Sequence, residues 1–160
     1  MCRWLFFIGF IVSNSTIWGQ QIIEINDLVD ERNFMPYEVT YFIDSTNKVT
    51  FNDISSGSYA DRFQQNSLYQ NKDFKINASY WIRLPIRHSV KSKKIWLLEF
   101  YDQTIDYFDA FVPQENGSYK KISMGDELPF TQRTLMHKNF EIILEMKSDT
   151  LMRWRIQKIT

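Results

Sequence analysis

The sequence has very little cysteine, proline and glycine. Its 160 residues include one Cys, four Pro and five Gly. A single cysteine, Cys2, excludes an internal disulfide and any metal site built from several cysteines. The scarcity of glycine disfavours a phosphate-binding loop, and the sequence has no Gly-x-Ser-x-Gly or paired-histidine motif. We therefore expect no cofactor and none of the common hydrolase sites.

Net charge is also lacking. Nineteen Lys and Arg balance nineteen Asp and Glu, so the formal net charge is zero. A protein without a basic excess has no general attraction to phosphate backbones or acidic lipid. We therefore expect no nucleic-acid partner.

Histidine is equally scarce, and the sequence predicts no metal site. His88 and His137 are the two histidines of the chain, and each follows or precedes polar residues far from any cysteine. Neither shows the local partners that a zinc site or a nucleophilic triad needs. We expect both to be exposed loop residues.

Carboxylates are plentiful but show no catalytic pattern. A glycosidase needs two of them facing each other about 5 to 10 Å apart across a cleft, which sequence spacing alone does not establish. Asp102 and Asp126 flank predicted strands in positions typical of turns. We therefore predict that the chain is not an enzyme, and an exported enzyme ranks third among the functions considered.

The N-terminus has the organisation of a signal peptide. Arg3 precedes the apolar run Trp4–Val12, which is about half of the roughly 20 residues that span a bilayer. Polar residues and Gly19 follow, so the sequence predicts a signal peptide over residues 1–19, cleaved after Gly19. Cys2 precedes the run, unlike a lipoprotein cysteine. We expect an exported chain without cysteine.

The rest of the chain predicts strands. Aromatic residues make up 16%, and apolar and polar residues alternate with period two without a competing helical pattern. Residues 20–36 form a polar lead-in, and residues 54–75 a long loop with a helical turn or two. The predicted strands are residues 38–43, 48–51, 80–87, 95–101, 105–112, 119–122, 140–146 and 152–158.

Two details accompany this pattern. Residues 113–118 have turn chemistry and predict a hairpin between the flanking strands. The strand over 80–87 alternates like a half-buried strand, whereas the strand over 95–101 is expected to be more fully buried. Short strands separated by turns, without intervening helices, indicate an all-β antiparallel sandwich or barrel.

Several segments carry a resemblance to a known family. The most specific part is a Trp-x-Arg strand followed by a Gly-Asp-x-x-Pro-Phe-x-x-Arg segment. The matching pieces are Tyr41–Asp44, Ala78–Arg83, Trp96–Glu99, Ile105–Phe108 and Gly125–Arg133. In this order they resemble the second type of extracellular sensory domain of bacterial receptors with seven membrane spans and diverse intracellular signalling modules.

The resemblance implies a fold, a place and a function. It implies a jelly-roll-like β-sandwich similar to carbohydrate-binding modules over residues 37–160, displayed in the periplasm ahead of a membrane region. Behind that region the family carries histidine kinases, as in two-component systems, diguanylate cyclases or other output modules. The chain ends at Thr160 without membrane spans. We expect either a piece of a receptor, cut short at its C-terminus, or a freestanding exported version.

One strand offers two candidate ligand-binding residues. Trp81 and Arg83 share a face opposite Tyr80, Ile82 and Leu84. Sugars bind by stacking on aromatic planes beside planar hydrogen-bonding side chains, so this face is suited to a carbohydrate. The alternative is that Trp81 fills the core and Arg83 pairs with a structural carboxylate.

Arg133 and Asp126 are the other candidates. The guanidinium fork of Arg133 suits an acidic or hydroxyl-rich ligand. The alternative is a structural pair with Asp126 or with a cluster of carbonyls.

Two functions of different classes follow. The first is a periplasmic ligand-sensing domain that binds a carbohydrate or another small molecule. The second is a structural domain without a ligand, whose exposed aromatic residues mediate receptor dimerisation, giving a homodimer, or contact with a partner.

Overall fold

The chain is built mostly of β-strands. The computed structural model describes residues 22–65, 75–88, 92–144 and, for the backbone, 150–157, so the predicted signal peptide lies outside the described residues. None of the described helices is long and apolar enough to cross a membrane. The strands are β1 (Ile23–Ile25), β2 (Thr40–Asp44), β3 (Gln64–Gln65), β4 (Ser79–His88), β5 (Trp96–Phe100), β6 (Tyr107–Pro113), β7 (Tyr119–Met124), β8 (Phe140–Leu144) and β9 (Thr150–Gln157).

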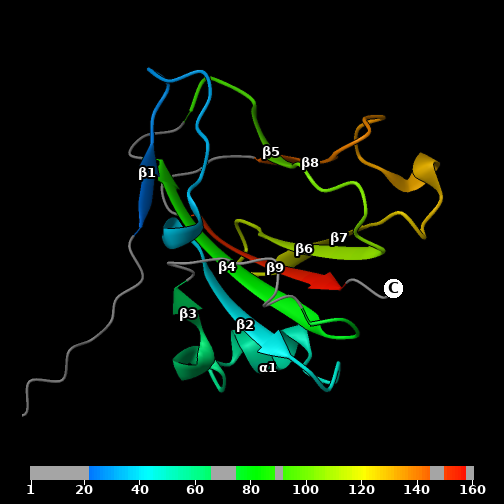
Figure 1. Ribbon diagram of the computed structural model, residues 1–160. Coiled ribbons are helices and arrows are strands. Elements are labelled where there is room, and N and C mark those ends of the chain that lie inside the picture. Colours follow the sequence, from blue (N-terminus) through cyan, green and yellow to red (C-terminus); the bar gives the residue numbers. More distant parts are fainter. Residues whose placement is uncertain (1–21, 66–74, 89–91, 145–149, 158–160) are drawn as a thin grey trace, which may run out of the picture.

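The strands form two sheets that pack face to face (Figure 1). The large sheet has the order β3-β2-β4-β9-β6-β7, with β1 beside β4, and the small sheet pairs β5 with β8. All described pairs are antiparallel except β1 with β4. The predicted all-β sandwich is confirmed, and its jelly-roll-like connectivity stays a prediction.

Strand β4 organises the large sheet. Its first half pairs with β2 as far as Arg83, and its last three residues pair with β1 from Ile86 onward. Pro85 lies between these two stretches. Because proline has no N–H to donate, a position without a partner strand on this side of β4 suits it, while on the other side Pro85 lies opposite Leu151 of β9.

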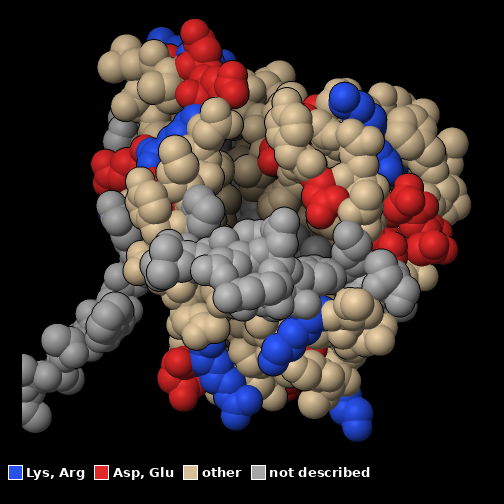
Figure 2. Space-filling model, viewed as in Figure 1, with Lys and Arg blue, Asp and Glu red and all other residues tan. Residues whose placement is uncertain are grey.

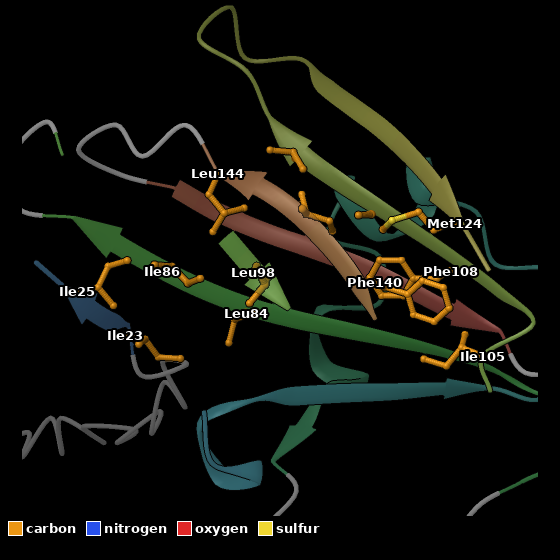
Figure 3. Close-up of a cluster of buried hydrophobic side chains, with 13 residues drawn as sticks. Ile23, Ile25, Leu84, Ile86, Leu98, Ile105, Phe108, Met124, Phe140 and Leu144 are labelled. Atoms are coloured by element: carbon orange, nitrogen blue, oxygen red, sulfur yellow. The ribbon is translucent and has the colours of Figure 1, made fainter. Parts of the chain in front are cut away.

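The main core lies between the two sheets (Figure 3). Phe108 of the large sheet and Phe140 of the small sheet are fully buried, and their rings stack with centroids 5.8 Å apart. The large sheet also contributes Leu84 and Ile86, and the small sheet Leu98. Burial of these apolar side chains stabilises the packing of one sheet on the other.

A second cluster covers the opposite face of the large sheet. Helix α1 (Phe51–Ser55) lays Phe51 flat on Phe111 of β6, with ring centroids 4.0 Å apart, and buries Ile54. Trp81 of β4 belongs to this cluster and is 1% exposed. Strand β4 is therefore buried on both faces, and the prediction of a half-buried strand is wrong.

Two further predictions need correction. The strand predicted over 48–51 is absent, because Thr50 is the N-cap of α1 and exchanges hydrogen bonds with Asp53 in a capping box. Strand β5 is less buried than expected, since only Leu98 among its residues is buried. The hairpin of β6 and β7 is confirmed, and its turn is closed by the Gln114 N–H donating to Ser118 O at 2.8 Å.

The prediction that His88 is an exposed loop residue is also wrong. His88 is the last residue of β4, fully buried, and its Nε2 lies 3.0 Å from Asp27 Oδ1. The partner comes from the segment that follows β1, which the sequence predicted only as a polar lead-in. His137 does lie in a loop, half-buried, before β8.

Candidate functional site

A cavity of about 740 Å³ opens between the two sheets. Strands β2 and β4 of the large sheet and β5 and β8 of the small sheet all contribute residues to the lining of this cavity. Figure 2 shows the molecule hollowed near its centre, between the segment that carries β1 and the small sheet. The cavity is continuous with the main core, because Leu84, Ile86 and Leu98 belong to both.

Aromatic side chains from three parts of the chain line this cavity. The large sheet provides tyrosines from β2 and β4, the small sheet provides aromatic residues from and next to β5, and the N-terminal segment provides a phenylalanine. They are Phe34, Tyr41, Tyr80, Trp96, Phe100 and Tyr101. Tyr101 is 83% exposed, so its ring is accessible at the rim.

Most of the charged residues in the cavity lining belong to the N-terminal segment. The N-terminal segment between β1 and β2 contributes Asp30, Glu31, Arg32 and Asn33, and β5 contributes Glu99. The cavity therefore combines flat apolar surfaces with planar hydrogen-bonding groups, an arrangement typical of small-molecule sites.

Arg32 is held in place within the N-terminal segment. Its guanidinium forms an ion pair with Glu38 and donates from Nη1 to Glu24 O of β1 at 3.0 Å. The second carboxylate oxygen of Glu38 accepts the Met35 N–H at 2.9 Å. These contacts give the segment a defined shape, because one side chain bridges β1 and the turn before β2.

Asp27 attaches the same segment to the start of β5. Its carboxylate accepts from the Ser92 hydroxyl at 2.5 Å and from the Lys93 N–H at 2.8 Å, and it lies 3.0 Å from His88 Nε2. These groups, the Ser92 hydroxyl above all, lower the pKa of Asp27 to about 2. Ser92 Oγ in turn accepts from Trp96 Nε1 at 2.9 Å, so the contact network reaches a cavity-lining ring.

The strand with the predicted site residues presents its other face to the cavity. Tyr80 and Ile82 line the cavity, whereas Trp81 lies in the second cluster behind the sheet. Arg83 is on that rear face as well, with its guanidinium 3.9 Å from the centroid of the Phe63 ring. The structure thus places Trp81 in the core, the alternative set out above, and neither residue among the cavity-lining side chains.

Arg133 and Asp126 also lie outside the cavity lining. Arg133 Nη1 donates to the carbonyls of His137 and Lys138 at 2.8 and 2.6 Å, and its guanidinium lies over the Phe130 and Phe140 rings. The carbonyl-cluster alternative therefore describes Arg133. Asp126 is exposed, and its backbone N–H donates to Ile105 O at 2.8 Å. The structure does not bring the four predicted residues together.

The Gly-Asp segment has a structural reason of its own. A Cβ at Gly125 would lie 1.9 Å from Asp106 O, so only glycine fits where the chain leaves β7. The close approach allows the Asp126 and Glu127 N–H groups to pair with residues 105 and 106. In this part of the resemblance, the end of β7 therefore packs closely against the backbone just before β6.

The comparisons with known proteins identify the family. No curated protein and no solved structure matches the chain. The family described as 7TMR-DISM extracellular 2 matches residues 37–158, which cover most of the chain. The chain therefore belongs to the 7TMR-DISM extracellular 2 family, whose members are sensory extracellular domains of receptors with seven transmembrane spans.

Proposed function

We propose that this domain is the ligand-sensing part of its receptor and binds a carbohydrate or another small molecule in the cavity between the two sheets. The observation that carries the proposal is the cavity wall itself. Tyr41, Tyr80 and Trp96 supply aromatic surfaces, and the N-terminal segment supplies charged and amide groups facing them.

The size of the cavity supports a ligand of this class. Sites for small molecules have volumes of about 300 to 1,000 Å³, and the cavity falls within that range at about 740 Å³. Aromatic rings stack on the apolar faces of sugar rings, while carboxylates, amides and guanidinium groups bond to hydroxyls at the ring edge. Glu31 and Asn33 offer such groups.

The receptor would use this site on the periplasmic side of the membrane. A ligand bound in the cavity touches the large sheet, the small sheet and the N-terminal segment at once, because all three contribute to its lining. Binding therefore favours one relative placement of these parts. An intracellular output module, such as a histidine kinase, would respond to that change.

A ligand screen tests the proposal. The chain is exposed to a glycan array and to a thermal-shift panel of sugars, nucleosides and carboxylic acids, and at least one compound is expected to bind. Tyr101→Ala should weaken that binding at least tenfold, because the substitution removes an exposed ring at the cavity rim.

Tyr107→Ala is the matched control. Tyr107 is a partly exposed tyrosine on β6, outside the cavity lining, and its removal should leave affinity unchanged. Absence of binding across the panel, or equal losses in both variants, would count against a ligand in this cavity.

One observation favours the second function, a domain for contact with another copy. Leu97 and Ile143 lie directly opposite each other on the outer face of the small sheet, 50% and 40% exposed. Ile143→Lys should abolish any self-association seen by sedimentation, and Ile76→Lys, at a 61% exposed position outside this sheet, should not. A monomer at all concentrations would remove this function.

A further inference from the structure

Three metal-ligating side chains meet on the outer face of the small sheet. Glu99 of β5 and Glu141 of β8 are directly opposite each other in the strand register, and His137 comes from the loop before β8. His137 Nδ1 lies 3.0 Å from Glu141 Oε1 and 3.8 Å from Glu99 Oε1. All three ligand atoms lie within 4.8 Å of one another.

The carboxylates of Glu99 and Glu141 lie on the same face of two paired strands. Two carboxylates directly opposite each other on one face of a strand pair repel and destabilise the sheet. A neutral imidazole carries a lone pair on one ring nitrogen, and Nδ1 is the His137 nitrogen that lies beside both carboxylates. A cation at this point takes the place of the Asn139 N–H, whose nitrogen lies 3.3 Å from Nδ1. Three electron-pair donors therefore converge, and a cation between them relieves the repulsion.

The distances suit a metal ion. Zinc binds histidine nitrogen and carboxylate oxygen at about 2.0 to 2.2 Å. Atoms bound to one such ion lie roughly 3 to 4 Å from each other. The separations of 3.0 and 3.8 Å from His137 Nδ1 match this spacing without rearrangement of the strands.

Neighbouring residues hold the ligands in position. Asn139 is 2% exposed, donates from Nδ2 to Glu99 Oε1 at 2.6 Å and accepts from Gln103 Nε2 at 3.1 Å. Arg133 Nη1 donates to the His137 carbonyl at 2.8 Å, which holds the backbone of the histidine in place. Hydrogen-bonded partners of this kind orient the ligands of metal sites and raise their affinity.

We propose that Glu99, His137 and Glu141 bind a divalent first-row transition-metal ion, with Zn²⁺ as the best-suited example. One imidazole and two carboxylates suit zinc, whereas Ca²⁺ takes six to eight oxygen ligands. Three protein ligands leave a coordination position open. Glu99 also lines the cavity, so the ion lies beside the site proposed above, yet its binding does not depend on any cavity ligand.

A metal titration tests this proposal. The tag-free chain carries Cys2→Ser, so that the cysteine does not compete for the ion, and is stripped of metal with a chelator before calorimetric titration with Zn²⁺ and, separately, Ca²⁺. We expect one Zn²⁺ per chain and much weaker Ca²⁺ binding. His137→Ala and the isosteric Glu141→Gln should each weaken Zn²⁺ binding at least tenfold, because each removes a ligand.

Glu127→Gln is the control, since it removes an exposed carboxylate outside the site. It should bind Zn²⁺ like the parent chain. Zn²⁺ should also raise the melting temperature of the parent but not of His137→Ala, while circular dichroism of the metal-free chains shows that both fold. The proposal is overturned if the parent binds no Zn²⁺, if His137→Ala binds it equally well, or if Ca²⁺ binds as tightly and independently of His137.

Discussion

Asp27 joins three separate parts of the molecule: the segment after β1, the end of β4 and the approach to β5. Its single carboxylate contacts the end of β4 through His88 and the approach to β5 through Ser92 and Lys93. The segment after β1, which forms one wall of the cavity, is thereby fastened to both sheets. The lowered pKa of Asp27 means that the folded chain favours the ionised carboxylate.

Asp27→Asn should change how stability depends on pH. The pKa of Asp27 is about 2 in the folded chain, below its ordinary value of 3.8. The ionised carboxylate therefore stabilises the fold above about pH 4, and this contribution is lost as the pH falls towards 2. Between pH 5 and 2 the melting temperature of the variant should fall less steeply than that of the parent.

Two details make the measurement decisive. The pKa values of Asp30 and Asp53 are also lowered, so the slope should decrease without vanishing. Asp126→Asn, on an exposed loop, should keep the parental slope. An unchanged profile for Asp27→Asn would mean that its contacts do not stabilise the folded chain.

At the scale of single elements, α1 depends on its first residues. The helix has only five residues, and Thr50 and Asp53 satisfy each other's backbone N–H groups at its start. Thr50→Ala should lower the free energy of unfolding by about 1 kcal/mol, the usual cost of losing an N-cap. Urea unfolding measures this loss. Thr131→Ala, at an exposed position, should change little, and equal effects would contradict the cap.

The same element shows where prediction from sequence fails. Residues 48–51 have a strand-like composition. The capping signal that favours a helix instead spans only the four residues from Thr50 to Asp53, so it is weak in the sequence. By contrast, the sequence predicts β4 nearly to the residue, because the alternation of apolar and polar residues continues over a long strand. Strand β1 has three residues and pairs with a distant strand, so local pattern carries little signal for it.

The side of a strand that faces a site was not predictable either. Trp81 and Ile82 are adjacent apolar residues on β4. Trp81 packs in the second cluster, and Ile82 packs against the main core on the other side of the strand. Period two separates the two faces but does not say which one borders the cavity. Which face borders the cavity depends on how the small sheet and the N-terminal segment pack on the large sheet. This packing is set by contacts between residues far apart in sequence.

At the scale of the whole molecule, the domain extends beyond the region that matches the family. The match begins at residue 37, yet β1 pairs with β4 and inserts Ile23 and Ile25 into the main core. The following residues, including Arg32, line the cavity. The segment is therefore part of the sandwich, and the stability of the fold depends on it.

Neighbouring isoleucines provide a test of this view. Ile23 is 2% exposed and Ile22 is 42% exposed. Ile23→Ala should lower the free energy of unfolding by about 2 to 4 kcal/mol, because it leaves a hole in the core, while Ile22→Ala should stay within about 0.5 kcal/mol of the parent. Urea unfolding of the full chain compares them. Equal, small losses would show that the segment before residue 37 is a separable leader, and the cavity would then lack one of its walls.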